Sequence, residues 1–144
     1  MSASRRLLVV EDDLKLAKLI ERLLPRWSVT IRGGAQDALD VIAAGERFDA
    51  LLCDLHLRGM SGHEFYARLE PGLRACTVIM TGGPFTPTAR DFLEHEKDRL
   101  RVLRKPFTAA ELRDMLDATA PPGSDGGGPA AAGGMDPRAM GSVP

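Results

Sequence analysis

The sequence has little cysteine and few aromatic residues: two cysteines, one tryptophan, one tyrosine and five phenylalanines among 144 residues. Two cysteines are too few for the disulfide framework of a small secreted protein. Cys53 and Cys76 lie inside apolar segments, where a small core residue is the ordinary interpretation. Neither sign of charge dominates, since there are 19 basic and 20 acidic residues, so nucleic acid and anionic membranes are not indicated as partners.

Long apolar runs are also missing from the N-terminal region. Between Arg6 and Glu11 there are only four apolar residues, Leu7 to Val10, which is too short for the core of a signal peptide or for a membrane span. We therefore expect a cytoplasmic location and no contact with a membrane. The sequence also lacks the Gly-x-x-x-x-Gly-Lys-Ser/Thr loop, so a nucleotide is not indicated as a phosphate source.

What the sequence does contain is a regular alternation of short apolar runs and segments with helical spacing. It predicts strands at 7–10, 27–31, 50–53, 77–80 and 102–103, and helices at 16–24, 35–44, 63–69, 86–96 and 108–117. Thr108 and Glu111 have the spacing of a capping box at the start of the last helix. Strands that alternate with helices predict an α/β fold, in which helices cover both faces of a parallel sheet.

The composition changes abruptly near residue 120. Residues 1–119 are predicted to form one domain. Residues 120–144 consist mainly of Gly, Pro, Ala and Ser and show no periodicity. Such a segment is predicted to be a disordered tail or linker.

Polar residues that can carry chemistry follow the predicted strands. After the first, third, fourth and fifth strands come, in turn, Glu11-Asp12-Asp13, Asp54, Thr81 and Lys105. Open parallel sheets bind ligands beyond the carboxyl ends of their strands, so these side chains are expected to meet at one edge of the sheet. Singly, each has an ordinary explanation, because an acidic residue such as Asp13 often caps the following helix and the others can be turn or surface residues.

Taken together, these side chains indicate phosphoryl transfer. Three clustered carboxylates repel one another unless a cation lies between them. Mg²⁺ suits such a set, because it binds one or two carboxylates together with carbonyl oxygens and water. A cation, a nucleophilic carboxylate, a lysine and a hydroxyl are the parts needed to form an aspartyl phosphate.

In order and spacing, these residues resemble the receiver domains of bacterial response regulators, over about residues 5–118. The resemblance is carried by Leu-Leu-Val-Val-Glu11-Asp12-Asp13, Leu-Leu-Cys-Asp54-Leu-His-Leu-Arg-Gly-Met-Ser-Gly62, Val-Ile-Met-Thr81-Gly-Gly and Lys105-Pro106-Phe107. It implies a flavodoxin-like, doubly wound sheet of five parallel strands with the order 2-1-3-4-5. It also implies a phosphoacceptor of two-component signalling that catalyses only its own phosphorylation and dephosphorylation, and is not a turnover enzyme.

The resemblance further implies a role for each site residue. Asp54 would be phosphorylated, and Thr81 and Lys105 would each bind an oxygen of the phosphoryl group. The Lys105–Pro106 peptide bond would be cis. Mg²⁺ would be held by Asp12, by Asp54, by the backbone carbonyl of His56 and, through water, by Glu11.

Partners also follow from the resemblance. The phosphoryl donor would be a phosphohistidine on a sensor histidine kinase or on a phosphotransfer protein. The signal would pass to a downstream protein target, without nucleic-acid contact through this domain. A homodimer through the surface at Pro87–Asp117 is a further expectation.

Several positions depart from the family pattern or modify it. Val102 stands three residues before the lysine, where the family usually has an aromatic residue whose rotation reports phosphorylation. Arg58 stands four residues after Asp54, where the family often has proline, and this changes the stiffness of the loop. His56 and Gly83 stand where the family tunes hydrolysis of the acyl phosphate, and His56 is expected to alter the lifetime of that bond. The alternative for His56 is a solvent-facing loop residue.

Three alternatives stay open from the sequence. A phosphatase of the haloacid-dehalogenase type also uses an Asp after a strand, but it requires Asp-x-Asp where this chain has Asp54-Leu-His56. A degenerate receiver that serves only as a binding module is favoured by Val102 alone. The chain is either a stand-alone regulator or a receiver from a hybrid kinase or a longer regulator.

Overall fold

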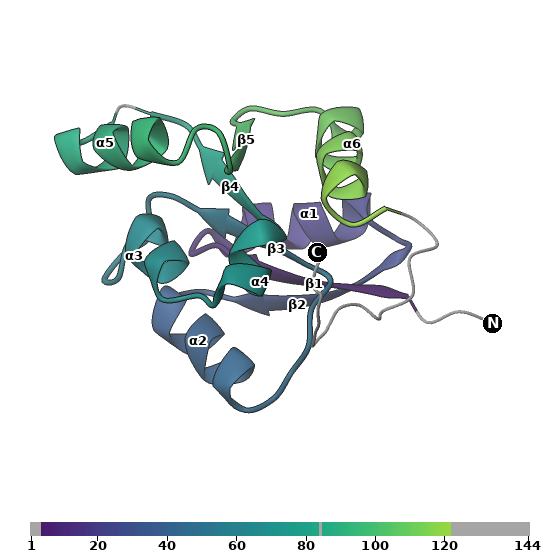
Figure 1. Ribbon diagram of the computed structural model, residues 1–144. Helices are drawn as coiled ribbons and strands as arrows, with labels where there is room; N and C mark the ends of the chain where they lie inside the picture. Colours follow the sequence, from purple (N-terminus) through teal and green to yellow (C-terminus); the bar gives the residue numbers. More distant parts are fainter. Residues whose placement is uncertain (1–3, 84, 122–144) are drawn as a thin grey trace.

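The strands with unbroken apolar runs form the centre of one parallel sheet. The computed structural model describes residues 4–83 and 85–121 and contains a sheet with the order β2-β1-β3-β4-β5 (Figure 1). The strands are β1 (Arg5–Val10), β2 (Trp27–Arg32), β3 (Ala50–Asp54), β4 (Thr77–Thr81) and β5 (Arg101–Arg104). Every residue of β3 and β4 is buried, as central strands covered on both faces require. The predicted strand order is confirmed.

Helices cover both faces of this sheet. The helices are α1 (Leu14–Leu23), α2 (Ala35–Ala43), α3 (Gly62–Ala67), α4 (Pro71–Ala75), α5 (Pro87–His95) and α6 (Ala109–Thr119). Side chains of α1 and α6 pack with Leu7 and Val9 of β1 in one cluster. Side chains of α2, α3 and α5 pack with Leu8 and Val10 in the other. Alternate side chains of β1 therefore point to opposite faces of the sheet, as the two-residue period of a strand requires.

The structure differs from the predicted elements mainly in three ways, and the other boundaries shift by one or two residues. It has a sixth helix, α4, which begins with Pro71 at its first turn and was not predicted. Its strands β3 and β4 are one residue longer than predicted and include Asp54 and Thr81. Its first helix begins at Leu14 rather than at residue 16, because Asp13 caps it through hydrogen bonds from the backbone N–H groups of Lys15 and Leu16.

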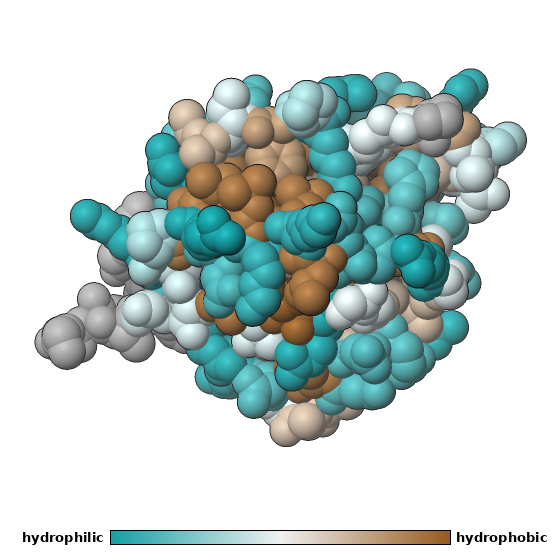
Figure 2. Space-filling model, turned by 180° about the vertical axis from the view of Figure 1, so that it is seen from behind, coloured by the Kyte–Doolittle hydropathy of each residue, from teal (hydrophilic) through white to brown (hydrophobic). Residues whose placement is uncertain are grey.

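The last helix that the structure describes, α6, ends at Thr119. From residue 122 onward, the predicted disordered tail lies outside the described residues. Within the described ranges, no helix is both long enough and apolar enough to cross a membrane. Seen from behind, the molecule shows a gathering of apolar side chains on one face (Figure 2). The large apolar side chains that are most exposed both belong to α1: Leu14 at 61% and Leu19 at 47%.

Candidate functional site

The parallel register places the polar residues that follow the strands at one edge of the sheet. Val10 of β1 pairs with Cys53 of β3, one residue before Asp54. Asp54 in turn pairs with Met80 of β4, one residue before Thr81. Glu11, Asp54 and Thr81 therefore leave neighbouring strands at the same level. The convergence predicted from the sequence is confirmed.

Three carboxylates form the centre of this edge. One oxygen each from Glu11, Asp12 and Asp54 lies within 4.8 Å of the others. Glu11 and Asp54 are nearly inaccessible, with 2% and 5% of their surface exposed. Carboxylates this close in a poorly solvated place disfavour one another's charged form, so the cluster is suited to a cation.

Lys105 partly neutralises this cluster. Its Nζ donates a hydrogen bond to Oδ2 of Asp54 at 3.0 Å and another to Oε1 of Glu11 at 3.0 Å. Burial by itself lowers the pKa of Lys105, but the hydrogen bonds to Asp54 and Glu11 outweigh it and the pKa is raised. The ammonium is therefore kept charged at the point where it touches both carboxylates.

Glu11 is the carboxyl group whose protonation the site changes most clearly. Burial raises the pKa of Glu11 to about 7, and the hydrogen bonds from the Asp13 backbone N–H and from Lys105 offset only part of this effect. The nearby Asp54 carboxylate raises the pKa further. Glu11 therefore exchanges its proton near neutral pH in the metal-free site.

Asp12 and Asp13 have different surroundings although they are adjacent. Oδ2 of Asp12 accepts a hydrogen bond from the backbone N–H of Arg58 at 3.2 Å, and the Arg58 guanidinium Nε lies 3.7 Å from the same oxygen. The Arg58 side chain is 93% exposed, so this ion pair is weak. Asp13 is the N-cap of α1, which confirms the ordinary interpretation of that residue.

The loop after Asp54 is packed tightly against the backbone of the same residue. Oδ1 of Asp54 accepts a hydrogen bond from the backbone N–H of His56 at 3.0 Å. A Cβ atom on Gly62 would lie 2.4 Å from the Asp54 carbonyl oxygen and 2.7 Å from the Leu55 Cα. Only glycine fits at that position, since real Cβ atoms do not approach backbone so closely. In the sequence, Gly62 was named only as the last residue of the motif around Asp54, without a steric role.

Thr81 and Lys105 are joined through the backbone. The Lys105 N–H donates to the Thr81 carbonyl oxygen at 2.8 Å, and the Lys105–Pro106 peptide bond is cis, as predicted. The Thr81 hydroxyl is buried and has no hydrogen-bond partner among the residues that the structure describes. A buried hydroxyl without a partner is costly, so this oxygen is suited to a ligand group that enters the site.

These residues fit a hard divalent cation. The three carboxylates supply the oxygen ligands that Mg²⁺ prefers, and their mutual repulsion is relieved by it. The predicted set also includes the backbone carbonyl of His56, which belongs to the loop fixed on Asp54 by the His56 N–H. The donors are all oxygen, which favours Mg²⁺ over metals that prefer nitrogen or sulfur ligands.

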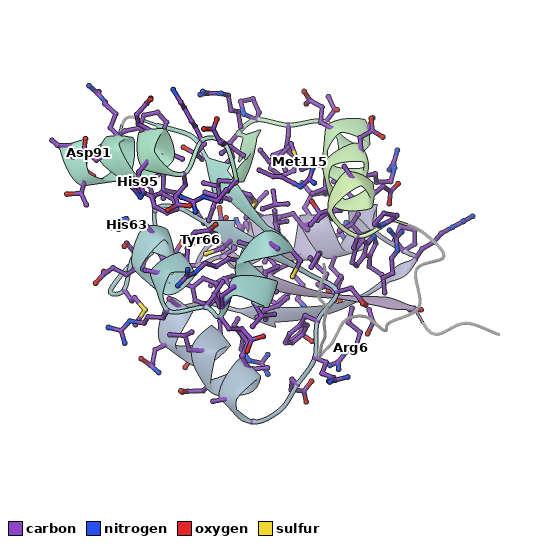
Figure 3. All side chains as sticks on the ribbon, in the orientation of Figure 1. Arg6, His63, Tyr66, Asp91, His95 and Met115 are labelled. Atoms are coloured by element: carbon purple, nitrogen blue, oxygen red, sulfur yellow. The ribbon has the colours of Figure 1, made fainter. Side chains whose placement is uncertain are left out.

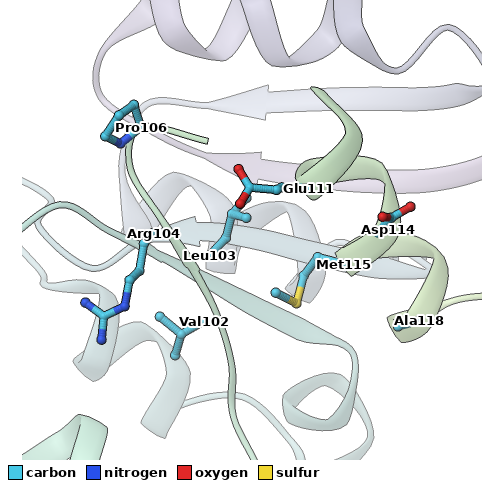
Figure 4. Close-up of a pocket in the computed structure, with 8 residues that line it drawn as sticks. All are labelled: Val102, Leu103, Arg104, Pro106, Glu111, Asp114, Met115 and Ala118. Carbon is cyan, nitrogen blue, oxygen red and sulfur yellow. The ribbon is translucent and has the colours of Figure 1, made fainter. Parts of the chain in front are cut away.

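Val102 borders a cavity rather than the carboxylate cluster. The cavity has a volume of about 580 Å³ and lies between β5 and α6 (Figure 4). Val102, Leu103, Arg104, Pro106, Glu111, Asp114, Met115 and Ala118 line it. All of these residues except Ala118 belong to the Pro87–Asp117 surface, for which a homodimer was predicted.

The three histidines lie in different environments. His56 is exposed, and its ring stacks on Phe85 with the ring centres 6.1 Å apart. His63 lies on α3 with Tyr66, on the side toward α5, where both rings contact Phe92 (Figure 3). His95 ends α5 with its side chain 77% exposed, as expected of a surface residue. The contact of His56 with Phe85 had no signal in the sequence, because the two residues lie on different loops.

The comparisons with known sequences agree on one family. The sequence profile of the response regulator receiver domain matches residues 7–117. The sensory/regulatory protein RpfC of Xanthomonas campestris pv. campestris is 34% identical over 119 residues, which cover 78% of this chain and 16% of that protein. The two-component response regulator ARR14 of Arabidopsis thaliana is 30% identical over 116 residues, which cover 76% of this chain and 29% of that protein. The chain thus spans only a minor part of the length of either relative.

Solved structures show the same fold. The chemotaxis protein CheY4 of Vibrio cholerae has a TM-score of 0.68 at 21% identity, over 81% of this chain and 99% of that one. The signal receiver domain of an HD domain-containing protein from Pseudomonas fluorescens Pf-5 has a TM-score of 0.70 at 22% identity, over 81% of this chain and 94% of that one. With the family profile covering residues 7–117, the chain belongs to the response regulator receiver domains of two-component signalling.

Proposed function

We propose that this chain is a phosphoacceptor that receives a phosphoryl group on Asp54 from a phosphohistidine. The observation that carries this proposal is the environment of the Asp54 carboxylate. The side chain is buried, with Oδ2 on the Lys105 ammonium and Oδ1 on the His56 backbone N–H, each at 3.0 Å. A nucleophile fixed in this way loses little further freedom when it attacks a bound phosphoryl group.

In the proposed transfer, an oxygen of Asp54 bonds to phosphorus while the bond from phosphorus to the donor's imidazole nitrogen breaks. The electron pair of the broken bond stays with the imidazole. Lys105 is kept charged and donates to an oxygen of the transferring group. The Thr81 hydroxyl donates to another oxygen, which would give this buried group the partner that it lacks within the described residues.

Mg²⁺ is the proposed cofactor. Asp12, Asp54 and the His56 carbonyl would hold it, with Glu11 acting through water. When bound, the ion neutralises negative charge on the phosphoryl oxygens. Support for this set comes from the separation of no more than 4.8 Å among the three carboxylates.

His56 is proposed to set the lifetime of the acyl phosphate. Its backbone is bonded to Asp54 and its ring is exposed beside the site, where it can interact with the water that hydrolyses the product. A dephosphorylation rate that is the same in wild type and His56→Asn would exclude this role and leave a solvent-facing loop histidine.

The partners are proposed from the family. The donor is a sensor histidine kinase or a phosphotransfer protein, and the output is a downstream protein target. The proposed domain spans residues 1–119, and the proposed homodimer surface is Pro87–Asp117. The family match supports a receiver over the phosphatase alternative, and the degenerate binding module is an outcome of the experiment.

The experiment is the measurement of intact mass after incubation with Mg²⁺ and acetyl phosphate. Wild type is expected to gain one phosphoryl group, and the gain should be absent without Mg²⁺ and absent in Asp54→Ala. Asp13→Asn is the matched control, because this neighbouring carboxylate only caps α1 and asparagine is also a good N-cap. A folded wild type that gains no mass would instead support the degenerate module.

A further inference from the structure

An aromatic ring lies beside the site although Val102 is not aromatic. Phe85 is on the loop between β4 and α5, four residues after Thr81. Its ring centre lies 6.1 Å from that of His56, and the two ring planes are inclined by only 22°. The ring is half-buried and packs against the cluster that contains Leu55 and Leu57. Phe85 therefore joins the loop after β4 to the loop after β3.

Both members of this stack lie on loops that begin at the residues that a phosphoryl group would contact. The backbone N–H of His56 donates to Oδ1 of Asp54, and that oxygen changes its charge when the acyl phosphate forms. On the other side, the Thr81 hydroxyl is buried without a partner among the described residues, and Thr81 is the last residue of β4, from which the loop that carries Phe85 begins. A phosphoryl group on Asp54 would thus act on both loops at once.

Two glycines give the Phe85 loop the freedom to move. Gly82 and Gly83 follow Thr81, and Gly83 has a φ of +47°, in the left-handed region that favours glycine. A Cβ on Gly83 would lie 3.7 and 3.8 Å from two atoms of the Phe85 ring, which is ordinary van der Waals contact. Backbone rotation at these residues can move Phe85 while β4, which is buried throughout, stays in place.

Val102 is not suited to the same task. It is a β-branched residue with few rotamers, and it lines the cavity between β5 and α6. Phe85 and Val102 nevertheless pack against the same apolar cluster. A shift of Phe85 can therefore change the packing around Val102, at the surface beside β5.

We propose that the stack of Phe85 on His56 is the structural element that reports phosphorylation in this chain. The rings are stacked while Asp54 is free, and phosphorylation separates them and exposes the Phe85 ring at the surface next to α5. This inference rests on the proposed function, because it requires a phosphoryl group on Asp54.

The test places a fluorescent ring at position 85. In the double variant Phe85→Trp, Trp27→Phe, the tryptophan at position 85 is the only one in the chain. Acrylamide quenching is measured before and after phosphorylation by acetyl phosphate and Mg²⁺, with the adduct quantified by intact mass in the same samples. Quenching is expected to rise about twofold when a half-buried ring becomes exposed. Adding His56→Ala should give strong quenching already before phosphorylation and no further rise.

The matched control is Phe48→Trp in the same Trp27→Phe background. Phe48 precedes β3, at the opposite end of the sheet, and its ring lies under the Arg6 guanidinium. Its quenching is expected to stay constant on phosphorylation. An equal rise at both positions would show a general loosening and overturn the proposal, as would full phosphorylation with constant quenching at position 85. Absence of the adduct would overturn the proposed function, and the inference with it.

A measurement without substitution at position 85 protects the test against a variant that does not fold. Wild type is labelled with fluorophenylalanine, and the resonance that is missing from Phe85→Leu is assigned to residue 85. This resonance is expected to shift with phosphorylation in proportion to the adduct. A constant resonance beside a complete adduct would overturn the proposal.

Discussion

The Nζ of Lys105 lies 3.0 Å from Oε1 of Glu11, although the strands that carry these two residues are not neighbours. Glu11 follows β1 and Lys105 follows β5, with β3 and β4 between them. The lysine thus extends across the edge of the sheet and links its two halves above Asp54. The strength of this link depends on the charge of Glu11, whose pKa of about 7 makes it sensitive to pH.

Mg²⁺ binding is expected to strengthen as the pH rises through 7. A protonated Glu11 cannot help to hold a hydrated cation, and burial keeps it protonated up to about pH 7. Below that pH, the affinity should fall by up to about tenfold per pH unit. Calorimetric titration between pH 6 and 8 would measure this change. The Glu11→Gln variant should bind Mg²⁺ more weakly, and its affinity should not depend on pH in this range. A variant whose Mg²⁺ affinity changes with pH as in wild type would show that Glu11 is not the group responsible.

The stability of the metal-free protein is expected to fall as the pH rises, whereas Mg²⁺ binding strengthens. The folded state keeps the Glu11 proton up to about pH 7, whereas the ordinary value is 4.5. The folded state therefore binds more protons between these values, and its advantage, fully present below pH 4.5, is lost as the pH rises to 7. The loss is roughly 3 kcal/mol at most. Urea unfolding followed by circular dichroism would measure it, and Glu11→Gln should flatten the profile.

Gly62→Ala is expected to destabilise the fold by about 2–3 kcal/mol, since the new Cβ overlaps rigid backbone. The clash is with the carbonyl of Asp54 itself, so the variant should also accept phosphate more slowly. Gly72→Ala in α4 is the control, because its Cβ would meet only the Glu70 side chain, at 3.5 Å. That variant should lie within about 1 kcal/mol of wild type in urea unfolding. Equal stability of the two variants would show that the loop after β3 relaxes around Gly62.

Val102→Phe is expected to change stability by less than about 1 kcal/mol, because the half-buried Val102 borders a cavity that can take the added atoms. The same substitution at Val78 is the control. Val78 is completely buried in β4, where overpacking should cost about 1–3 kcal/mol or more. Thermal unfolding of both variants would measure the difference. A similar loss in the two would mean that the cavity beside β5 does not accept an aromatic ring.

Arg5→Lys is expected to destabilise the domain by about 1–2 kcal/mol. The Arg5 guanidinium lies 4.2 Å from the centre of the Trp27 ring and donates to Asp117 at 2.8 Å and to the Ala120 carbonyl at 2.7 Å. An ammonium group cannot make all three contacts. The exposed Arg113 of α6 provides the control, where the same substitution should stay within about 0.5 kcal/mol. Urea midpoints that fall equally would refute the anchoring of the end of α6 by Arg5.

The parts of the fold that could be predicted are those with a strong local signal. The apolar runs at residues 7–10, 50–53 and 77–80 became the three central strands, because only buried parallel strands tolerate such runs. Their parallel arrangement then required Glu11, Asp54 and Thr81 to meet. The α4 helix was not predicted, since five residues with one proline are too short for a periodic pattern. The roles of these site residues stay predictions until phosphorylation is measured.

Contacts between loops could not be read from the sequence. The stacking of Phe85 on His56 and the close approach of Gly62 to Asp54 depend on how two loops pass each other in space. Neither contact produces a periodic pattern in the sequence. A glycine in a loop is usually explained by a turn, so the sequence gives no sign that Gly62 lies against backbone. The Lys105 contact with Glu11, between residues 94 positions apart, differs from these, because the order of the strands placed both residues at the same edge of the sheet.

The edge strand β5 has a consequence for behaviour at high concentration. Among the described strands it pairs only with β4, so its outer side carries backbone groups that another chain could pair with. β5 has only four residues and begins and ends with the exposed Arg101 and Arg104. A second copy that approached in register would bring like charges together along a very short ladder. Repulsion between these arginines therefore disfavours aggregation through the open edge. This effect is separate from signalling and from the stability of the single molecule.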